Sequence, residues 1–429
     1  MGFTREDVEG LSAHLREPGW VLERRLQAWD YVQKLELPRE KEEPWRYTDL
    51  KRMRFSLDHF SLASPSGGMP EETLALREEG ERAGSLIQRH TEVVTRDLNP
   101  ELAEQGVILT DINTAIAQYP ELMARHLFAG VAPDEHLFAA LHAALFAGGA
   151  FLYVPRGVTV ALPIETQLWI DQPGVGVFPH TLMVVEEDAE VAYIERYRSP
   201  ELPGPSLCSG AVEIVAGRAA RISFVSLQEY GGQVWNFQCQ RAVSESDVTL
   251  RSLVVNLGAR FSRVEVESVL RGERSFSEML GLYFAEEGQD FDMRTLQDHV
   301  APASTSDLLY KGALRDRSHT IYAGLIRVNP GAAKTDAYQA NRNLVLSDEA
   351  KADSKPELEI LNNDVRCTHG STVGQIDSEE LFYLQARGIS VEEAQRLIVY
   401  GFFEEVLKRV GIEEIRLALG RAITRKLEG

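Results

Sequence analysis

Short runs of alternating apolar and polar residues fill the chain from about Phe151 to Ile376, and no helix-length segment separates them. The runs are rich in β-branched and aromatic residues, which is typical of strands. A parallel sheet of strand–helix–strand units is therefore excluded. A polar turn with one or two small residues recurs from Asp188 to Lys351 at intervals of 30, 29, 27, 43 and 34 residues. This spacing predicts a β-solenoid rather than a sandwich, because roughly 225 residues of strands exceed a typical sandwich.

The segments on either side of this region are predicted to be helical caps. Residues 1–150 form the first region, with a Ser/Pro/Gly-rich linker near 61–70, and residues 377–429 form the last. We expect helices in the first 60 residues, at Glu71–Val94 and between Asp111 and Phe146. Leu137 to Val154 is expected to be a buried helix that runs into a strand, since it is too short and broken to cross a bilayer.

Short sequence motifs predict local structure in both caps. Pro44 opens a turn with Trp45 and Tyr47, two aromatic residues that we expect to anchor the first helices on the body of the protein. Asp377–Glu380 and Ser390–Glu393 are capping boxes, which predict two helix starts in the last region. The second helix should bury one face carrying Leu397, Ile398, Phe402, Val406, Leu407 and Val410.

Composition and motifs exclude several classes of function. The chain has 45 Lys+Arg against 65 Asp+Glu and a net charge of −20, so nucleic acid and anionic membranes are unlikely partners. The first ten residues contain no apolar run, which predicts no signal peptide and a cytoplasmic protein. Phosphate-loop, dinucleotide-binding, nucleophile-elbow and His-Glu-x-x-His motifs are all missing from the sequence.

The three cysteines, Cys208, Cys239 and Cys367, are too few for a disulfide framework or a four-thiolate site. Cys208 and Cys239 are predicted to be inert. Cys367 and His369 would share one face of a strand, where a thiolate and an imidazole could bind iron, zinc or a thiol-borne sulfur species. Two ligands do not complete a site, and the residues alone favour a buried structural cysteine beside a solvent-facing histidine.

Several stretches of the sequence are specific enough to carry a resemblance: Pro44–Leu50, Tyr310–Gly312, Gly324–Val328, Pro330–Gly331, Lys334–Gln339, Asn341–Leu344, Leu346–Asp353, Lys355–Ile360, Asp364–Gly374, Leu381–Leu384 and Arg387–Ala394. They resemble the SufB/SufD family of iron–sulfur cluster assembly proteins. The resemblance to the SufD branch is stronger, because no cysteine precedes Cys208 and because Gly370, rather than a glutamate, follows His369.

This resemblance implies a right-handed parallel β-helix with helical ends, acting as a non-catalytic scaffold. It implies pairing with a SufB-like subunit through the β-helices, and docking of a SufC-like ABC ATPase on the last helical region. The docking residues would be Leu381, Phe382, Tyr383, Phe402 and Phe403. His369 matches the family histidine at the SufB interface, and Cys367 matches the neighbouring cysteine.

On this basis we expect His369, as a neutral imidazole, to ligate iron or a nascent cluster that SufB shares. The chain would hold no cofactor alone, and binding of a reduced flavin stays open. Two alternatives are a β-helix polysaccharide-active enzyme, a class that is usually secreted, and a structural homodimer. A sugar-degradation assay tests the first, and size measurement with and without SufB and SufC tests the second.

Overall fold

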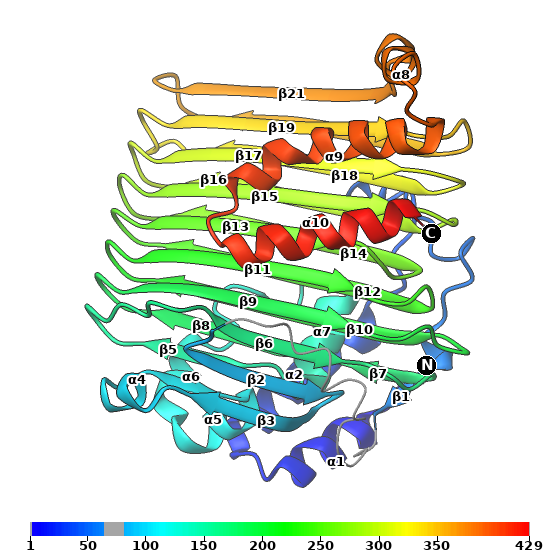
Figure 1. Ribbon diagram of the computed structural model, residues 1–429. Helices are drawn as coiled ribbons and strands as arrows, with labels where there is room; N and C mark the ends of the chain where they lie inside the picture. The colour runs from blue at the N-terminus through cyan, green and yellow to red at the C-terminus, as the bar shows by residue number, and fades with distance from the viewer. Residues whose placement is uncertain (1, 64–80, 429) are drawn as a thin grey trace.

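The computed structural model describes residues 2–63 and 81–428 of the chain. Its centre is a β-solenoid of about eight turns, flanked by helices at both ends of the sequence (Figure 1). Successive strands alternate between two sheets, and from β8 onwards each strand pairs in parallel with the strand two places further along. The predicted fold class, mainly β with a solenoid core, is therefore confirmed.

The first sheet, here called sheet A, contains β1 (Ser61–Leu62), β4 (Ile108–Thr110), β5 (Phe151–Val154), β7 (Val175–Val177), β8 (His180–Val185), β10 (Ser206–Ala216), β12 (Val234–Ser244), β14 (Phe261–Leu270), β16 (Asp290–His299), β18 (His319–Val328) and β20 (Lys351–Ile360). The second, sheet B, contains β2 (Gly84–Arg89), β3 (Glu92–Leu98), β6 (Ile164–Trp169), β9 (Glu190–Arg198), β11 (Arg221–Glu229), β13 (Thr249–Asn256), β15 (Phe276–Ala285), β17 (Thr305–Leu314), β19 (Asp336–Val345) and β21 (Arg366–Gln375).

The turns that enter sheet B show the true repeat of the solenoid. They contain residues with left-handed φ angles between 57° and 63°, which are Asp188, Ala219, Asp247, Arg274, Ala303 and Lys334. Their separations of 31, 28, 27, 29 and 31 residues correspond to one coil of two strands. The 43-residue interval in the sequence pattern does not correspond to one coil, so this part of the predicted repeat was wrong. Arg317 lies in the turn before β18 and Lys351 is the first residue of β20, both in sheet A, and Ala303 was missed because alanine is not a typical turn residue.

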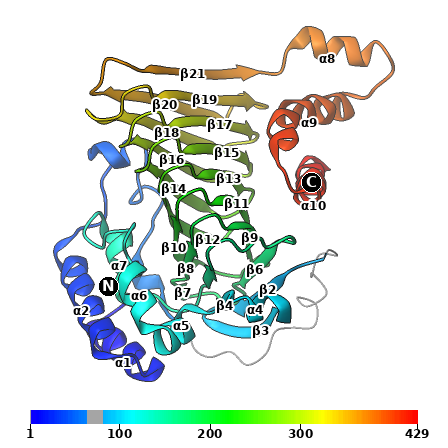
Figure 2. The ribbon, with the colours of Figure 1, turned by 90° about the vertical axis from the view of Figure 1, so that its left-hand side faces the viewer.

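With the exception of α4 (Pro100–Glu104), which lies beside β3, the N-terminal helices cover the outer face of sheet A (Figure 2). The other helices before the solenoid are α1 (Arg5–Leu15), α2 (Gly19–Lys34), α5 (Ile112–Gln118), α6 (Pro120–His126) and α7 (Leu137–Leu145), with short 3-10 turns at Glu43–Trp45 and Leu57–His59. Every residue of α7 is buried, and the chain then enters β5, as predicted for Leu137 to Val154.

The turn after Pro44 anchors the N-terminal segment on sheet A, as expected. Trp45 is buried, and the guanidinium of Arg263 lies 3.8 Å from the centre of its ring. The Thr48 hydroxyl donates to the buried carboxylate of Asp292 at 2.7 Å. Tyr47, by contrast, remains exposed.

The C-terminal helices α8 (Ser378–Gln385), α9 (Val391–Arg409) and α10 (Glu413–Glu428) lie on the other side of the solenoid, and α9 and α10 pack on sheet B (Figure 1). Asp377 and Ser390 cap α8 and α9 with their side chains, so both predicted helix starts are confirmed. The predicted buried face of α9 was partly wrong. Leu397 is 47% exposed, and the buried residues of α9 are Ala394, Val399, Phe403, Val406 and Leu407.

The expected helix at Glu71–Val94 is also wrong where the structure describes it, because β2 begins at Gly84 and β3 at Glu92. β2 pairs with β6 and extends sheet B, so tertiary pairing overrides the charged, helix-like composition of this stretch. Of the expected linker at 61–70, Ser61 and Leu62 pair with β7, and residues 64–70 lie outside the described residues, as do residues 71–80. Among the helices that are described, none is both long enough and apolar enough to cross a membrane.

Candidate functional site at the terminal coil

The last coil of the solenoid, formed by β20 and β21, has no further strand stacked on it within the described residues (Figure 2). β20 pairs with β18 alone, and β21 pairs with β19 alone. No residue of either strand is buried, although most residues of the preceding strands are. Leu358, Ile360, Leu361 and Val373 are exposed here. This end therefore presents free backbone hydrogen-bonding groups together with apolar side chains.

Cys367 and His369 lie on β21 in one row of the strand, as predicted. They stack over Ala337 and Gln339 of β19, which are both fully or almost fully buried. Because neighbours in register share a face, the two side chains continue an inward-facing row that the chain itself leaves uncovered. Cys367 is half-buried against Val365 and a small apolar cluster around Ala337, whereas His369 is exposed. The imidazole is therefore open to a neighbouring molecule.

The interior just below this coil is polar, and a chain of hydrogen bonds runs through it. The Ser371 hydroxyl donates to Ser354 at 2.7 Å, and the Ser354 hydroxyl donates to the side-chain oxygen of Asn341 at 2.7 Å. The Asn341 amide in turn donates to the Tyr283 hydroxyl at 3.0 Å. These bonds tie β20 and β21 to the coils beneath them, so the terminal coil is a fixed support for Cys367 and His369.

Electrostatics keep Cys367 in the thiol form when no cation is near. Burial raises the pKa of Cys367, and the carboxylate of Asp336 raises it further. Arg366 turns away from the cysteine row and forms an exposed ion pair with Asp336, Nε donating at 3.0 Å. A metal ion at this site would have to displace the thiol proton.

The ligand set at the terminal coil is incomplete. Within residues 2–63 and 81–428, the group of three or more His, Cys, Asp or Glu side chains that could hold a metal ion lies elsewhere. Cys367 and His369 are separated along the strand by about 6.6 Å, two residue rises. Any metal held by this end therefore needs ligands that another molecule brings.

The predicted docking residues of the C-terminal helices fall into two groups. Phe382 and Tyr383 on α8 are 70% and 56% exposed, and Leu381 is half-buried. Phe402 is half-buried under the ammonium of Lys311, which lies 4.7 Å from its ring. Phe403 is fully buried between α9 and sheet B, so it supports the helix and is not available for direct contact with a partner.

Sequence reasoning missed a second group of candidate ligands, which lies on the outer face of sheet A. It consists of His136, Cys239 and Glu265. His136 precedes α7, and 103 residues separate it from Cys239, so no spacing in the sequence connects them. Cys239, predicted to be inert, is a member of this group, whereas Cys208 is buried with a pKa that burial raises to about 12.

Comparison with known proteins matches almost the whole chain to one family. The family model described as SUF system FeS cluster assembly, SufBD core domain, matches residues 168–402, and the model for the SufBD protein N-terminal region matches residues 84–166. The iron–sulfur cluster assembly protein SufD of Bacillus subtilis (strain 168) is 30% identical over 435 residues, which cover 100% of this chain and 99% of that protein.

SufB of the same bacterium is 28% identical over 442 residues, covering 100% of this chain and 94% of that protein. A SufBD family protein of Staphylococcus epidermidis is 30% identical over 444 residues, with the same coverage. SufB and SufD are thus matched almost equally. With a core match over more than half of its length and relatives aligned along all of it, the chain belongs to the SufBD family of iron–sulfur cluster assembly proteins.

Proposed function

We propose that the chain is a non-catalytic scaffold subunit of the SufD type, which pairs with a SufB-like subunit and docks a SufC-like ATPase during iron–sulfur cluster assembly. Iron would enter where the two solenoids meet. The observation that carries the proposal is the open terminal coil, which exposes His369 beside Cys367 and supplies only part of a ligand set.

The SufD assignment rests on two features of the sequence. No cysteine precedes Cys208, and Gly370 follows His369 where SufB-type chains carry glutamate. A β-carbon at Gly370 would meet no atom within 4 Å, so packing within this chain does not require the glycine. The absence of a glutamate there is therefore a chemical difference, since a carboxylate would add a potential iron ligand.

The terminal coil is suited to pairing with another solenoid. Its free strand edges can continue the two sheets into a partner, and the apolar side chains of Leu358, Ile360 and Val373 would be covered in the process. Pro356 lies in β20, and proline, which lacks a backbone N–H, is typical of an edge strand. β21 contains no proline and so offers the complete edge for hydrogen bonding.

A shared interface would complete the ligand set. His369 offers an imidazole, a borderline ligand that suits iron, and Cys367 offers a thiol that a bound cation can deprotonate. Further thiolates or carboxylates would come from the SufB-like subunit. The relative named SufB is an iron–sulfur cluster assembly protein, which supports this partner class.

The test is to purify the complex with its SufB-like and SufC-like subunits and to measure iron and acid-labile sulfide. His369→Ala should lower both, while the assembled complex and its solubility stay unchanged. Thr368→Ala is the matched control, since the adjacent side chain points to the opposite face of β21. Unchanged iron and sulfide in the His369→Ala complex would refute the role.

For the ATPase, α8 is the element that supports docking. It has no buried residue and exposes Phe382 and Tyr383 at one end of the solenoid. Deletion of the whole C-terminal region would be a poor test, because α9 and α10 bury Phe403, Val406 and Leu419 against sheet B. The double variant Phe382→Ala/Tyr383→Ala should lose binding of the SufC-like subunit, whereas Leu417→Ala, which changes another exposed apolar residue, on α10, should keep it.

The same open end could instead pair two copies of this chain. Size measurement of the chain alone and with its two partners separates these states: a homodimer that persists unchanged with both partners present contradicts the scaffold proposal. The family membership gives no support to a polysaccharide-active enzyme.

A further inference from the structure

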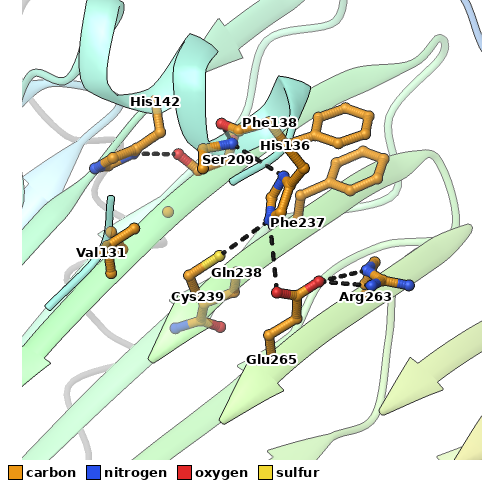
Figure 3. Close-up of a pocket in the computed structure, with 13 residues that line it drawn as sticks. Val131, His136, Phe138, His142, Ser209, Phe237, Gln238, Cys239, Arg263 and Glu265 are labelled. Atoms are coloured by element: carbon orange, nitrogen blue, oxygen red, sulfur yellow. Dashed lines mark hydrogen bonds and ion pairs between the residues drawn. The ribbon is translucent and has the colours of Figure 1, made fainter. Parts of the chain in front are cut away.

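Three side chains from three separate elements converge on the outer face of sheet A, beneath the loop before α7 (Figure 3). Cys239 Sγ lies 3.8 Å from His136 Nε2, and Glu265 Oε2 lies 3.5 Å from the same nitrogen. The three ligand atoms all lie within 4.8 Å of one another. No other group of this kind is found in the described ranges 2–63 and 81–428.

Each of the three side chains is held in place by the fold. Cys239 on β12 and Glu265 on β14 are direct partners in the parallel ladder, so they stand side by side on the same face. His136 is the N-cap of α7, and the Ala139 N–H donates to its Nδ1 at 3.2 Å. The edge of the ring packs against Trp45, with the ring centres 6.1 Å apart. The imidazole is therefore fixed with Nε2 directed at the other two ligands.

The two distances from His136 Nε2 are close to those of a tetrahedral metal site, and Cys239 Sγ and the Glu265 ligand oxygen lie within 4.8 Å of each other. With metal–nitrogen and metal–oxygen bonds near 2.0 Å and metal–sulfur bonds near 2.3 Å, tetrahedral ligand atoms lie about 3.3–3.6 Å apart. The observed separations of 3.5 Å and 3.8 Å need only a small contraction.

The charges also suit a divalent ion. Glu265 is ionised: burial opposes this, but the charge of Arg263 outweighs it and lowers the pKa of Glu265. Arg263 Nε donates to Oε1 at 2.7 Å and leaves Oε2 directed at His136. Burial raises the pKa of Cys239 well above its usual range, so the thiol is protonated until a cation displaces the proton. A thiolate and a carboxylate would then supply two negative charges, and Arg263, which pairs with Glu265, is also balanced by Asp292 at 2.6 Å.

An ion can reach this group from solvent. The side chains of His136 and Glu265 are each 15% exposed to solvent. Both line a groove between the segment around Trp45 and the outer face of sheet A, together with Glu135, Arg241 and Glu267. A fourth coordination position would face this groove and stay open to water or another small ligand.

We propose that His136, Cys239 and Glu265 bind one divalent transition metal ion of the zinc class. The site is complete within one chain and does not depend on the terminal coil or on any partner. It would join the start of α7 to sheet A and leave one coordination position open toward the groove.

Binding carries one identifiable cost. Nδ1 of His136 accepts the Ala139 N–H, so the neutral ring carries its proton on Nε2 in the metal-free protein. A metal on Nε2 moves that proton to Nδ1, and Ala139 loses its acceptor. The ion gains three ligands in exchange for one helix-cap hydrogen bond.

Cobalt(II) titration of the purified full chain tests the site, because cobalt adopts the tetrahedral geometry of zinc and reports a thiolate ligand by a sulfur-to-cobalt charge-transfer band. We expect one equivalent to bind with this band. Cys239→Ser should abolish it, whereas Cys208→Ser and Cys367→Ser should retain it. No band in the unmodified chain, or a band that persists in Cys239→Ser, would overturn the proposal.

Two further variants decide the question if Cys239→Ser fails to fold, as circular dichroism would show. Glu265→Gln and His136→Gln leave the thiol in place, so the band should remain while cobalt binds at least about tenfold more weakly. Unchanged cobalt affinity in both variants would also overturn the proposal. A band lost in Cys367→Ser would instead locate the ion at the terminal coil.

Discussion

Cysteine and histidine meet at two places in this solenoid, and the two places differ in what covers them. On the outer face of sheet A, the segments around Trp45 and α7 cover the strands, and His136 adds a ligand to Cys239 and Glu265. On β21, no further strand or helix of the described chain lies over Cys367 and His369, and no third ligand joins them. Three candidate metal ligands therefore come together where the N-terminal segments cross the outer face of sheet A.

This difference follows from the geometry of a solenoid. Each coil contacts only its neighbours, so a side chain in the middle of the stack is enclosed by the chain itself, whereas the last coil keeps one face free. Ligands from distant parts of the sequence meet only where a cap crosses the stack. A metal ion at the free end would need further ligands from another molecule, as the proposed pairing with a SufB-like subunit would provide.

The largest expected effect is on stability. It compares the loss of a buried ion pair beneath the N-terminal helices with the loss of an exposed ion pair at the terminal coil. Arg25 on α2 donates to Glu17 through Nε at 2.7 Å and to the carbonyl of Phe146 at 2.8 Å, and both charged side chains are almost completely buried. Arg25→Ala leaves Glu17 without its counter-charge. Chemical denaturation should show a loss of about 3–5 kcal/mol in the free energy of unfolding.

Arg366→Ala is the matched variant at the terminal coil. Its partner Asp336 stays in contact with water, so the unfolding midpoint should not change measurably. Equal losses for Arg25→Ala and Arg366→Ala would contradict the distinction between a covered and an open region.

The second prediction concerns the carboxylate enclosed inside the solenoid. Burial raises the pKa of Glu195 to about 7 from 4.5, although hydrogen bonds with Thr181 and Tyr197 act in the opposite direction. The folded state therefore holds a proton that the unfolded state has lost, and stability falls as the pH rises from about 4.5 through about 7. Glu195→Gln should stabilise the protein by about 3 kcal/mol at pH 8 and have little effect at pH 4.

A carboxylate near the open end should behave in the opposite way. Burial opposes ionisation of Asp353 on β20, but Lys351 and His319 outweigh it and lower the pKa of this residue. Asp353→Asn should therefore reduce stability at pH 8, and the difference should disappear in acid. Denaturation curves at the two pH values check both signs, and stabilisation of both variants at pH 8 would contradict this account.

The sequence predicts the parts of the fold that local chemistry determines. Alternation in the central region predicts strands, and the small-residue turns predict a solenoid, because inward and outward residues must alternate along each strand. The N-caps at Asp377 and Ser390 are equally local. The strand β2 was missed because its partner β6 lies some 80 residues further on in the chain, so only tertiary pairing determines its conformation.

The two candidate sites differ in the same way, since a local pattern predicts one of them and only the tertiary structure reveals the other. The shared row of Cys367 and His369 follows from their spacing of two residues on a strand, and it was predicted. The group of His136, Cys239 and Glu265 depends on the register of β12 with β14 and on the path of the chain across sheet A. Neither is encoded in a short motif. The burial of Phe403 also could not be predicted, because adjacent residues on a helix look equivalent until the packing face is known.

The smallest expected effect is on stability, and it compares removal of the N-cap of α9 with removal of the N-cap of α8. Ser390 accepts the Glu393 N–H at 3.2 Å at the start of α9, whose buried face packs on sheet B. Asp377 accepts the Glu379 N–H at 2.8 Å at the start of α8, which has no buried residue. Ser390→Ala should cost about 1 kcal/mol of global stability, because α9 unfolds together with the sheet that it covers. Asp377→Ala should lower the helical signal in circular dichroism without moving the unfolding midpoint, since α8 can fray independently of the solenoid. If Asp377→Ala lowers the midpoint as much as Ser390→Ala, α8 is part of the cooperative core and is a poor candidate for a free docking helix.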